Sequence, residues 1–92
     1  MKSKVLPYPG MDSWRFAYID KKISEKIRVA QAKKPRRGWG SVRVRATIGK
    51  TSWDTSIFPD KDGPYLLPLK AAVRKKEEIL DGDTIMLTIQ IK

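Results

Sequence analysis

The chain has 92 residues, of which 20 are lysine or arginine and 10 are aspartate or glutamate, so its net charge is +10. Histidine and cysteine are both absent, which excludes a thiol nucleophile, a serine–histidine pair and a Cys/His zinc cluster; we expect no enzyme, no metal site and no cofactor. The length predicts one domain over residues 1–92, and the lack of cysteine, of a signal-peptide pattern and of a long apolar run favours a cytoplasmic protein with no membrane partner.

The first predicted elements are a strand at 14–19 and a short helix at 21–29. The strand follows a turn-forming stretch that contains Pro and Gly, and these residues commonly separate regular elements. In the helix, Ile23 and Ile27 recur at helical spacing, and Val29 is expected to face inward with them.

The later elements have stronger patterns. In chain order they are strands at 41–48, 51–58 and 65–67, a helix at 70–80 and a strand at 84–92. The first of these strands alternates apolar and polar residues, which is typical of a strand with one wet face, and Gly49 and Lys50 suit a two-residue hairpin turn after it. Leu80 is expected to face inward at the end of the helix. In the last strand the expected inner face consists of Ile85, Leu87, Ile89 and Ile91.

A strand–helix–strand order occurs twice, first within 14–48 and again within 65–92. Each unit leaves one face apolar, and two such faces bury each other most simply when the strands close into a small barrel. We therefore predict an all-β fold, a closed barrel of about six strands with two short helices, built from two pseudo-duplicated halves. Trp14, Trp53 and Tyr65 are expected to pack in its core or at its ends.

A family resemblance is carried by three segments, WDTSIFP at 53–59, YLLPLKAAVR at 65–74 and GDT at 82–84. Together they resemble the domain-of-unknown-function family nineteen-oh-five, over roughly residues 14–92. The resemblance implies a six-stranded double-split β-barrel, and members of that family often adjoin a bacteriocin-protection domain. Parts of the same segments are more distantly similar to the half-barrels of AbrB-type transcription regulators and antitoxins, which build one barrel from two identical chains. Here both halves lie in one chain, which implies a monomer.

The positive charge is distributed unevenly. Residues 1–46 carry 13 lysines and arginines against three acids, whereas residues 47–92 carry seven of each. The whole excess therefore lies in the first half. Such an asymmetry predicts a surface that faces a polyanion, either nucleic acid or, less often, an anionic membrane.

The candidate binding residues lie in and just after the loop that follows the first helix. They are Lys33, Lys34, Arg36, Arg37, Trp39, Arg43 and Arg45. The cations would neutralise phosphates, and Trp39, between two glycines, would stack on a base. Arg43 and Arg45 share one face of a strand, about 7 Å apart, and exposed cations of the first helix would extend the patch.

Two classes of function remain open. The first is a nucleic-acid-binding module, with the choice between DNA and RNA left open. The second is a protein-interaction or accessory domain, in which the charge serves mainly solubility, the basic loop is simply solvated and Trp39 packs under the mouth of the barrel. Binding that weakens steeply with added salt would distinguish the first from the second.

Overall fold

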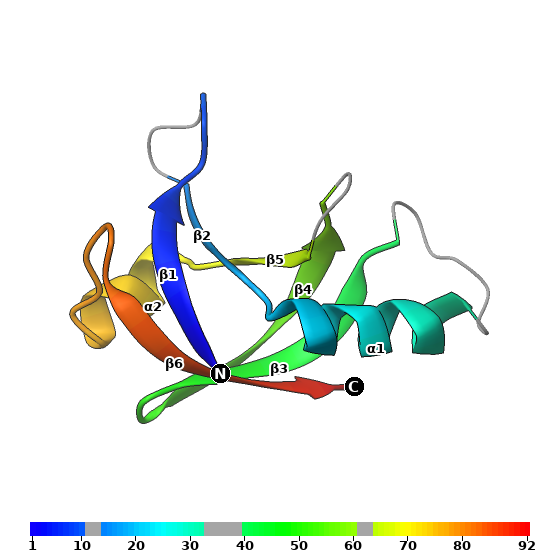
Figure 1. The fold of residues 1–92 in the computed structure, drawn as a ribbon. Helices are drawn as coiled ribbons and strands as arrows, with labels where there is room; N and C mark the ends of the chain where they lie inside the picture. Colours follow the sequence, from blue (N-terminus) through cyan, green and yellow to red (C-terminus); the bar gives the residue numbers. More distant parts are fainter. Residues whose placement is uncertain (11–13, 33–39, 61–63) are drawn as a thin grey trace.

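The computed structural model describes residues 1–10, 14–32, 40–60 and 64–92. Its elements, in chain order, are β1 (Lys2–Pro7), β2 (Arg15–Tyr18), α1 (Lys21–Ala32), β3 (Val42–Ile48), β4 (Thr51–Pro59), β5 (Tyr65–Pro68), α2 (Ala71–Lys76) and β6 (Thr84–Ile91). The strands form a closed antiparallel barrel in the order β1–β2–β5–β4–β3–β6 (Figure 1). The predicted six-stranded barrel with two short helices is confirmed.

Strand β1 was not among the predicted elements. It pairs with β2 on one side and with β6 on the other, so it closes the barrel. Its inner face consists of only Ser3 and Val5, which are buried, while Lys2 and Lys4 between them are exposed. Two inward residues among lysines make an alternation too weak to predict a strand.

The barrel has the internal symmetry that the duplicated pattern indicated. Exchanging β1, β2 and β3 with β4, β5 and β6 leaves the set of strand pairs unchanged: β2–β5 and β3–β6 are each converted into themselves, and the other four pairs interchange. The repeated unit is therefore strand–strand–helix–strand, one strand longer than predicted. In Figure 1 the helices α1 and α2 lie toward opposite ends of the barrel.

The inner faces of all six strands form one apolar core. It contains Val5, Ala17, Val44, Ala46, Ile57, Leu67 and Leu87, all almost fully buried, together with Ile27 from α1 and Val73 from α2. Trp53 and Tyr65 are buried in the same cluster, as predicted. Burial of these side chains supplies the main driving force for folding.

Val29 and Ile91, which were predicted to face inward, are exposed instead. Val29 lies two residues beyond Ile27, which is about 200° around an α-helix, so it faces away from the barrel. Ile91 is opposite Val44 of β3, but β1 pairs with β6 only at 84–86, so no strand covers Ile91 on its other side.

Helix α2 is shorter than the predicted 70–80. It ends at Lys76, and Glu78 has a left-handed backbone conformation with φ of 53°. This conformation interrupts the helix and turns Ile79 into the core. Leu80, which was expected inside, is 71 % exposed.

Candidate functional site

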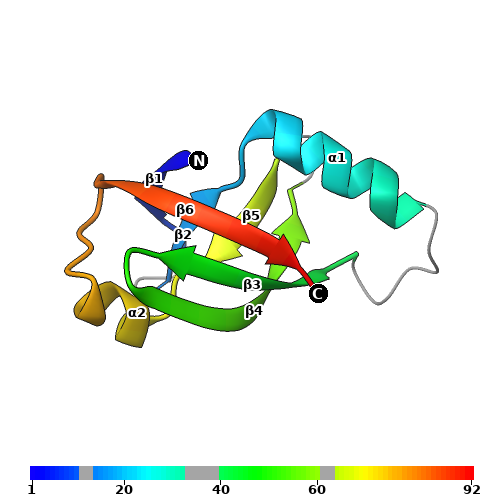
Figure 2. The ribbon, with the colours of Figure 1, turned by 90° about the horizontal axis from the view of Figure 1, so that it is seen from below.

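Two arginines extend from the outer face of β3. The positions on either side of them along the strand, Val42, Val44 and Ala46, are buried, whereas Arg43 and Arg45 are exposed. Figure 2 shows β3 between β6 and β4, with both helices toward the ends of the barrel and not over these strands. The arginines therefore lie side by side on an open surface, about 7 Å apart along the strand.

A single carboxylate, that of Asp54, lies among the cations of this surface. Lys92 Nζ is 2.7 Å from Asp54 Oδ2, and Arg45 Nη1 is 3.3 Å from Asp54 Oδ1. The hydrogen bond from Lys92, followed by the positive charges of Lys92, Arg45 and Arg43, lowers the pKa of Asp54 from its ordinary value. Arg43 Nη1 donates to Ser56 Oγ at 3.2 Å.

We call Arg43, Arg45 and Lys92 the basic face. Asp54 is the only acidic residue in β3, β4 and β6, so this surface keeps three cations against one carboxylate at neutral pH. Its other outward side chains include Ser52, Thr88 and Gln90, which are uncharged and able to donate hydrogen bonds. Beyond β6, the exposed Lys2 and Lys4 of β1 extend the positive surface around the barrel.

An apolar row lies on the outside of the barrel next to the basic face. The strand registers place Phe58 of β4 opposite Leu66 of β5, and Leu66 opposite Tyr18 of β2. These three side chains, which we call the apolar row, are only partly buried or exposed. Phe58 lies two residues from Ser56 on the same side of β4, so the row begins about 7 Å from the residue that contacts Arg43.

Further aromatic rings support this row. Phe16 contacts Tyr18 edge-to-face at a centroid distance of 5.1 Å, and Tyr8 contacts Phe16 in the same way at 5.6 Å. The Tyr18 hydroxyl donates to Asp60 Oδ2 at 3.2 Å. Desolvation, together with the nearby Asp60 carboxylate, raises the pKa of Tyr18, so its ring stays uncharged at physiological pH.

The sequence matches the family model described as Domain of unknown function (DUF1905) over residues 2–89. The chain belongs to the DUF1905 family. The match begins at residue 2 and so includes β1, the strand that closes the barrel. No curated protein matches the sequence. Within the ranges that the structure describes, no helix of this DUF1905 domain is long and apolar enough to cross a membrane.

Of the seven predicted binding residues, the structure places two. Arg43 and Arg45 lie on the basic face, as described above. Lys33, Lys34, Arg36, Arg37 and Trp39 lie outside the described residues. The structure adds Lys92, Lys2 and Lys4 to the positive surface. Their positions follow from the pairing of β6 with β3 and with β1, which the alternation of single strands does not reveal.

The cations of α1 form a separate exposed group. Lys21, Lys22 and Lys26 are exposed. Arg28 forms an ion pair with Glu25 at 3.5 Å, and its guanidinium carbon is 5.7 Å from the centroid of the Tyr65 ring. Arg28 thus contributes to holding the helix against β5.

The helix α1 is held on the barrel by polar contacts at its start. Asp20 Oδ1 accepts from Lys22 N at 2.8 Å, which caps the first turn. Ser24 Oγ donates to the Ile19 carbonyl at 3.2 Å and accepts from Tyr65 N at 3.0 Å, in the interior of the protein. These bonds orient α1 on the barrel, and the chain continues from the end of α1 into residues 33–39.

Trp14 lies at the end of the barrel, one of the two places predicted for it, and not in the core. Its side chain is 48 % exposed, because it lies just before β2, where the barrel ends. Its ring contacts Tyr8 edge-to-face at 6.4 Å. The wide apolar surface that makes tryptophan a good core residue is in this case left partly open to solvent.

Proposed function

We propose that this DUF1905 domain binds nucleic acid through the basic face. The observation that carries the proposal is the placement of Arg43 and Arg45 on an open sheet surface whose three strands contain one acidic residue. The spacing of the two arginines, about 7 Å, is close to the spacing of successive phosphates along one nucleic-acid strand. Arginine also matches phosphate geometry with paired donors.

The surroundings of the basic face favour the same ligand. Lys92 neutralises Asp54 at close range, which reduces the repulsion between that carboxylate and a phosphate. The outward hydroxyl and amide groups of β4 and β6 offer neutral donors of the kind that contact sugar and phosphate oxygens. The adjoining apolar row offers rings to unpaired bases, whose faces stack on aromatic side chains.

In this proposal the residues of the preceding loop extend the same surface. Lys33, Lys34, Arg36 and Arg37 come shortly before β3 in the chain and would add phosphate contacts, with Trp39 stacking on a base. The domain would act as a monomer, since both halves of its barrel lie in one chain, and in the cytoplasm.

The test is a titration with short oligonucleotides, single-stranded and double-stranded, of DNA and of RNA. At low salt we expect shifts in the amide signals of residues 33–45 and in the Trp39 indole signal. The double variant R43Q/R45Q should bind more weakly. Its plot of log K against log salt should lose about 1.4 units of slope for single strands and about 1.8 for duplexes, because each lost phosphate contact removes about 0.7 or 0.9.

A matched control removes the same charge elsewhere. Lys75 and Lys76 are exposed on α2 and do not belong to the basic face. The variant K75Q/K76Q should keep the wild-type slope. If both double variants weaken binding equally, the effect is one of net charge and the proposed face is wrong. If no oligonucleotide shifts residues 33–45 at low salt, nucleic-acid binding is refuted and a protein partner becomes the better explanation.

A further inference from the structure

A concave site lies beside α2 and includes no residue of the basic face. Its volume is about 350 Å³, and it is formed by the start of β2, the middle of β4, the end of β5 and the first turn of α2. Pockets for small molecules begin at about this size. Among the residues that the structure describes, the lining contains two tryptophans and three cations, Trp14, Trp53, Arg15, Lys70 and Arg74, and no carboxylate.

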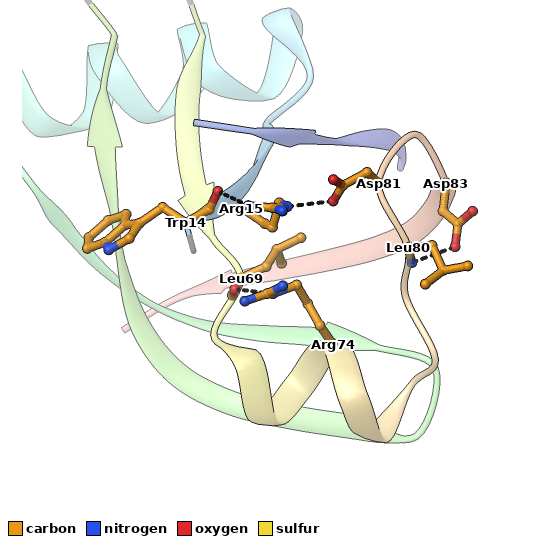
Figure 3. A network of polar contacts seen from close by, with 7 residues as sticks. All are labelled: Trp14, Arg15, Leu69, Arg74, Leu80, Asp81 and Asp83. Carbon is orange, nitrogen blue, oxygen red and sulfur yellow. Dashed lines mark hydrogen bonds and ion pairs between the residues drawn. The ribbon is translucent and has the colours of Figure 1, made fainter. Parts of the chain in front are cut away.

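The two arginines of this pocket are held in place by the protein. Arg15 Nε pairs with Asp81 Oδ1 at 2.5 Å, and Arg15 Nη1 donates to the Trp14 carbonyl at 2.9 Å. Arg74 Nε donates to the Leu69 carbonyl at 3.1 Å. Figure 3 shows Arg15 directed toward Asp81 and Arg74 toward Leu69. A ligand would therefore meet cations whose side chains are already ordered, which lowers the entropy cost of binding.

Lys70 differs from the two arginines. Its side chain is exposed, and among the described residues its ammonium group makes no hydrogen bond or ion pair. Lys70 therefore offers its positive charge directly to a ligand in the pocket. An ammonium group of this kind is a common phosphate binder in proteins.

The tryptophans supply the apolar part of the pocket. Trp14 is half exposed and is steadied by its edge-to-face contact with Tyr8, so its indole can form one wall. Trp53 is 8 % exposed, and its Nε1 has no acceptor among the described residues. A buried donor without an acceptor is unusual in folded proteins.

We propose that this pocket binds a small organic anion in which a planar ring carries a phosphate group, as in a nucleoside monophosphate. The ring lies against Trp14, and the phosphate lies at Lys70 in the positive field of Arg15 and Arg74. This inference uses none of the residues of the basic face, so it stands or falls independently of nucleic-acid binding there.

The test uses three probes, adenosine monophosphate, adenosine and inorganic phosphate, with the whole chain labelled for NMR. Adenosine monophosphate should shift the Trp14 and Trp53 indole signals and the amides of 69–74. It should bind about tenfold or more tightly than either fragment, because ring and phosphate contacts act together. Inorganic phosphate or adenosine binding as tightly as the whole nucleotide overturns the proposal, as does the absence of these shifts.

Two variants and one control substitution localise the effect. K70Q should weaken binding of adenosine monophosphate about tenfold, the size expected for one charged hydrogen bond. K75Q removes the same charge from the outside of α2 and should leave the affinity unchanged; equal losses in both variants refute the pocket. W14L should bind adenosine monophosphate no more tightly than inorganic phosphate, because the wall for the ring is lost. Both altered side chains are solvent-exposed, so the amide spectrum should confirm that the barrel is intact.

The source of the ligand follows from one more pair of probes. A tetranucleotide with a 5′-phosphate is compared with the same tetranucleotide ending in a 5′-hydroxyl. Shifts of the two indoles by the phosphorylated form alone assign the pocket to strand ends. Shifts by adenosine monophosphate and by neither tetranucleotide assign it to free nucleotides. The signals of 33–45 report separately on the basic face.

Discussion

Replacing Ser24 by alanine should destabilise the barrel more than its small size suggests. Ser24 is 1 % exposed, and its hydroxyl joins α1 to β5 and to the residue that follows β2, since it donates to the Ile19 carbonyl and accepts from the Tyr65 amide. Both backbone groups lose this partner in the variant, and the space left by one oxygen atom is too small to hold a water molecule.

The expected loss of unfolding free energy is about 2–4 kcal/mol, from two buried polar groups at about 1–3 kcal/mol each with partial relaxation. A domain of this length has a total stability of about 5–14 kcal/mol. The melting temperature should therefore fall by roughly 10–30 °C. Urea unfolding should show a lower midpoint with the same slope, and the Tyr65 amide should exchange faster with solvent.

An exposed hydroxyl pair provides the control. Thr47 Oγ1 and Ser52 Oγ lie 2.8 Å apart on the outer surface of β3 and β4. Thr47→Ala should change the stability by less than about 0.5 kcal/mol, because water replaces the lost bond. If Ser24→Ala costs no more than Thr47→Ala, the buried hydroxyl does not hold α1 on the barrel and the reasoning fails.

Three further changes test other parts of the structure. Gly49→Ala should cost about 1–3 kcal/mol in unfolding experiments, because φ is +58° and a Cβ there would displace the Glu77 carboxylate, which accepts a hydrogen bond from Thr51 Oγ1 at 2.6 Å. Gly10→Ala has a φ of +80° but meets no atom, so it should cost less; equal losses would show that displacing Glu77 costs nothing. Lys92→Gln should raise the carboxyl pKa of Asp54 in an NMR titration. The stability that this pairing contributes is present above the unfolded pKa of Asp54 and is lost as the pH falls through the lowered folded pKa. The variant lacks the pairing, so its unfolding free energy should fall less steeply as the pH is lowered through this range. Asp54→Asn should tighten oligonucleotide binding and steepen its salt dependence; weaker binding would show that the carboxylate positions Arg45 for the ligand.

The strands with one wet face were predictable, because apolar and polar residues alternate along each of them without interruption. In β3 the buried and exposed positions follow the sequence pattern residue by residue, so the exposure of Arg43 and Arg45 followed directly from it. The same reasoning fails at strand ends. Ile91 continues the alternation of β6, yet no neighbouring strand reaches far enough to cover it.

The sites formed by several strands could not be predicted in this way. The apolar row depends on which strands are neighbours, because Tyr18, Leu66 and Phe58 come from β2, β5 and β4 and are brought together only by the order of the barrel. The pocket beside α2 likewise combines Trp14 with Trp53 and Lys70. One local signal was present for the row, since both faces of β2 and β5 carry apolar residues, which indicates a strand with an apolar outer side.

The two symmetry-related halves of the barrel differ in the charge of their outward side chains. The equivalent strands β3 and β6 lie side by side as a pair, and the outward positions of β6 are Met86, Thr88 and Gln90, where β3 has arginines. A barrel made from two identical halves would place arginines on both strands and would present them with two-fold symmetry. This barrel presents them on one strand only, and Asp54 stands opposite Arg45 on the neighbouring β4. The two arginines therefore come from one half of the fold, whereas Lys92 and Asp54 come from the other, and recognition of the basic face needs no symmetry in the ligand itself.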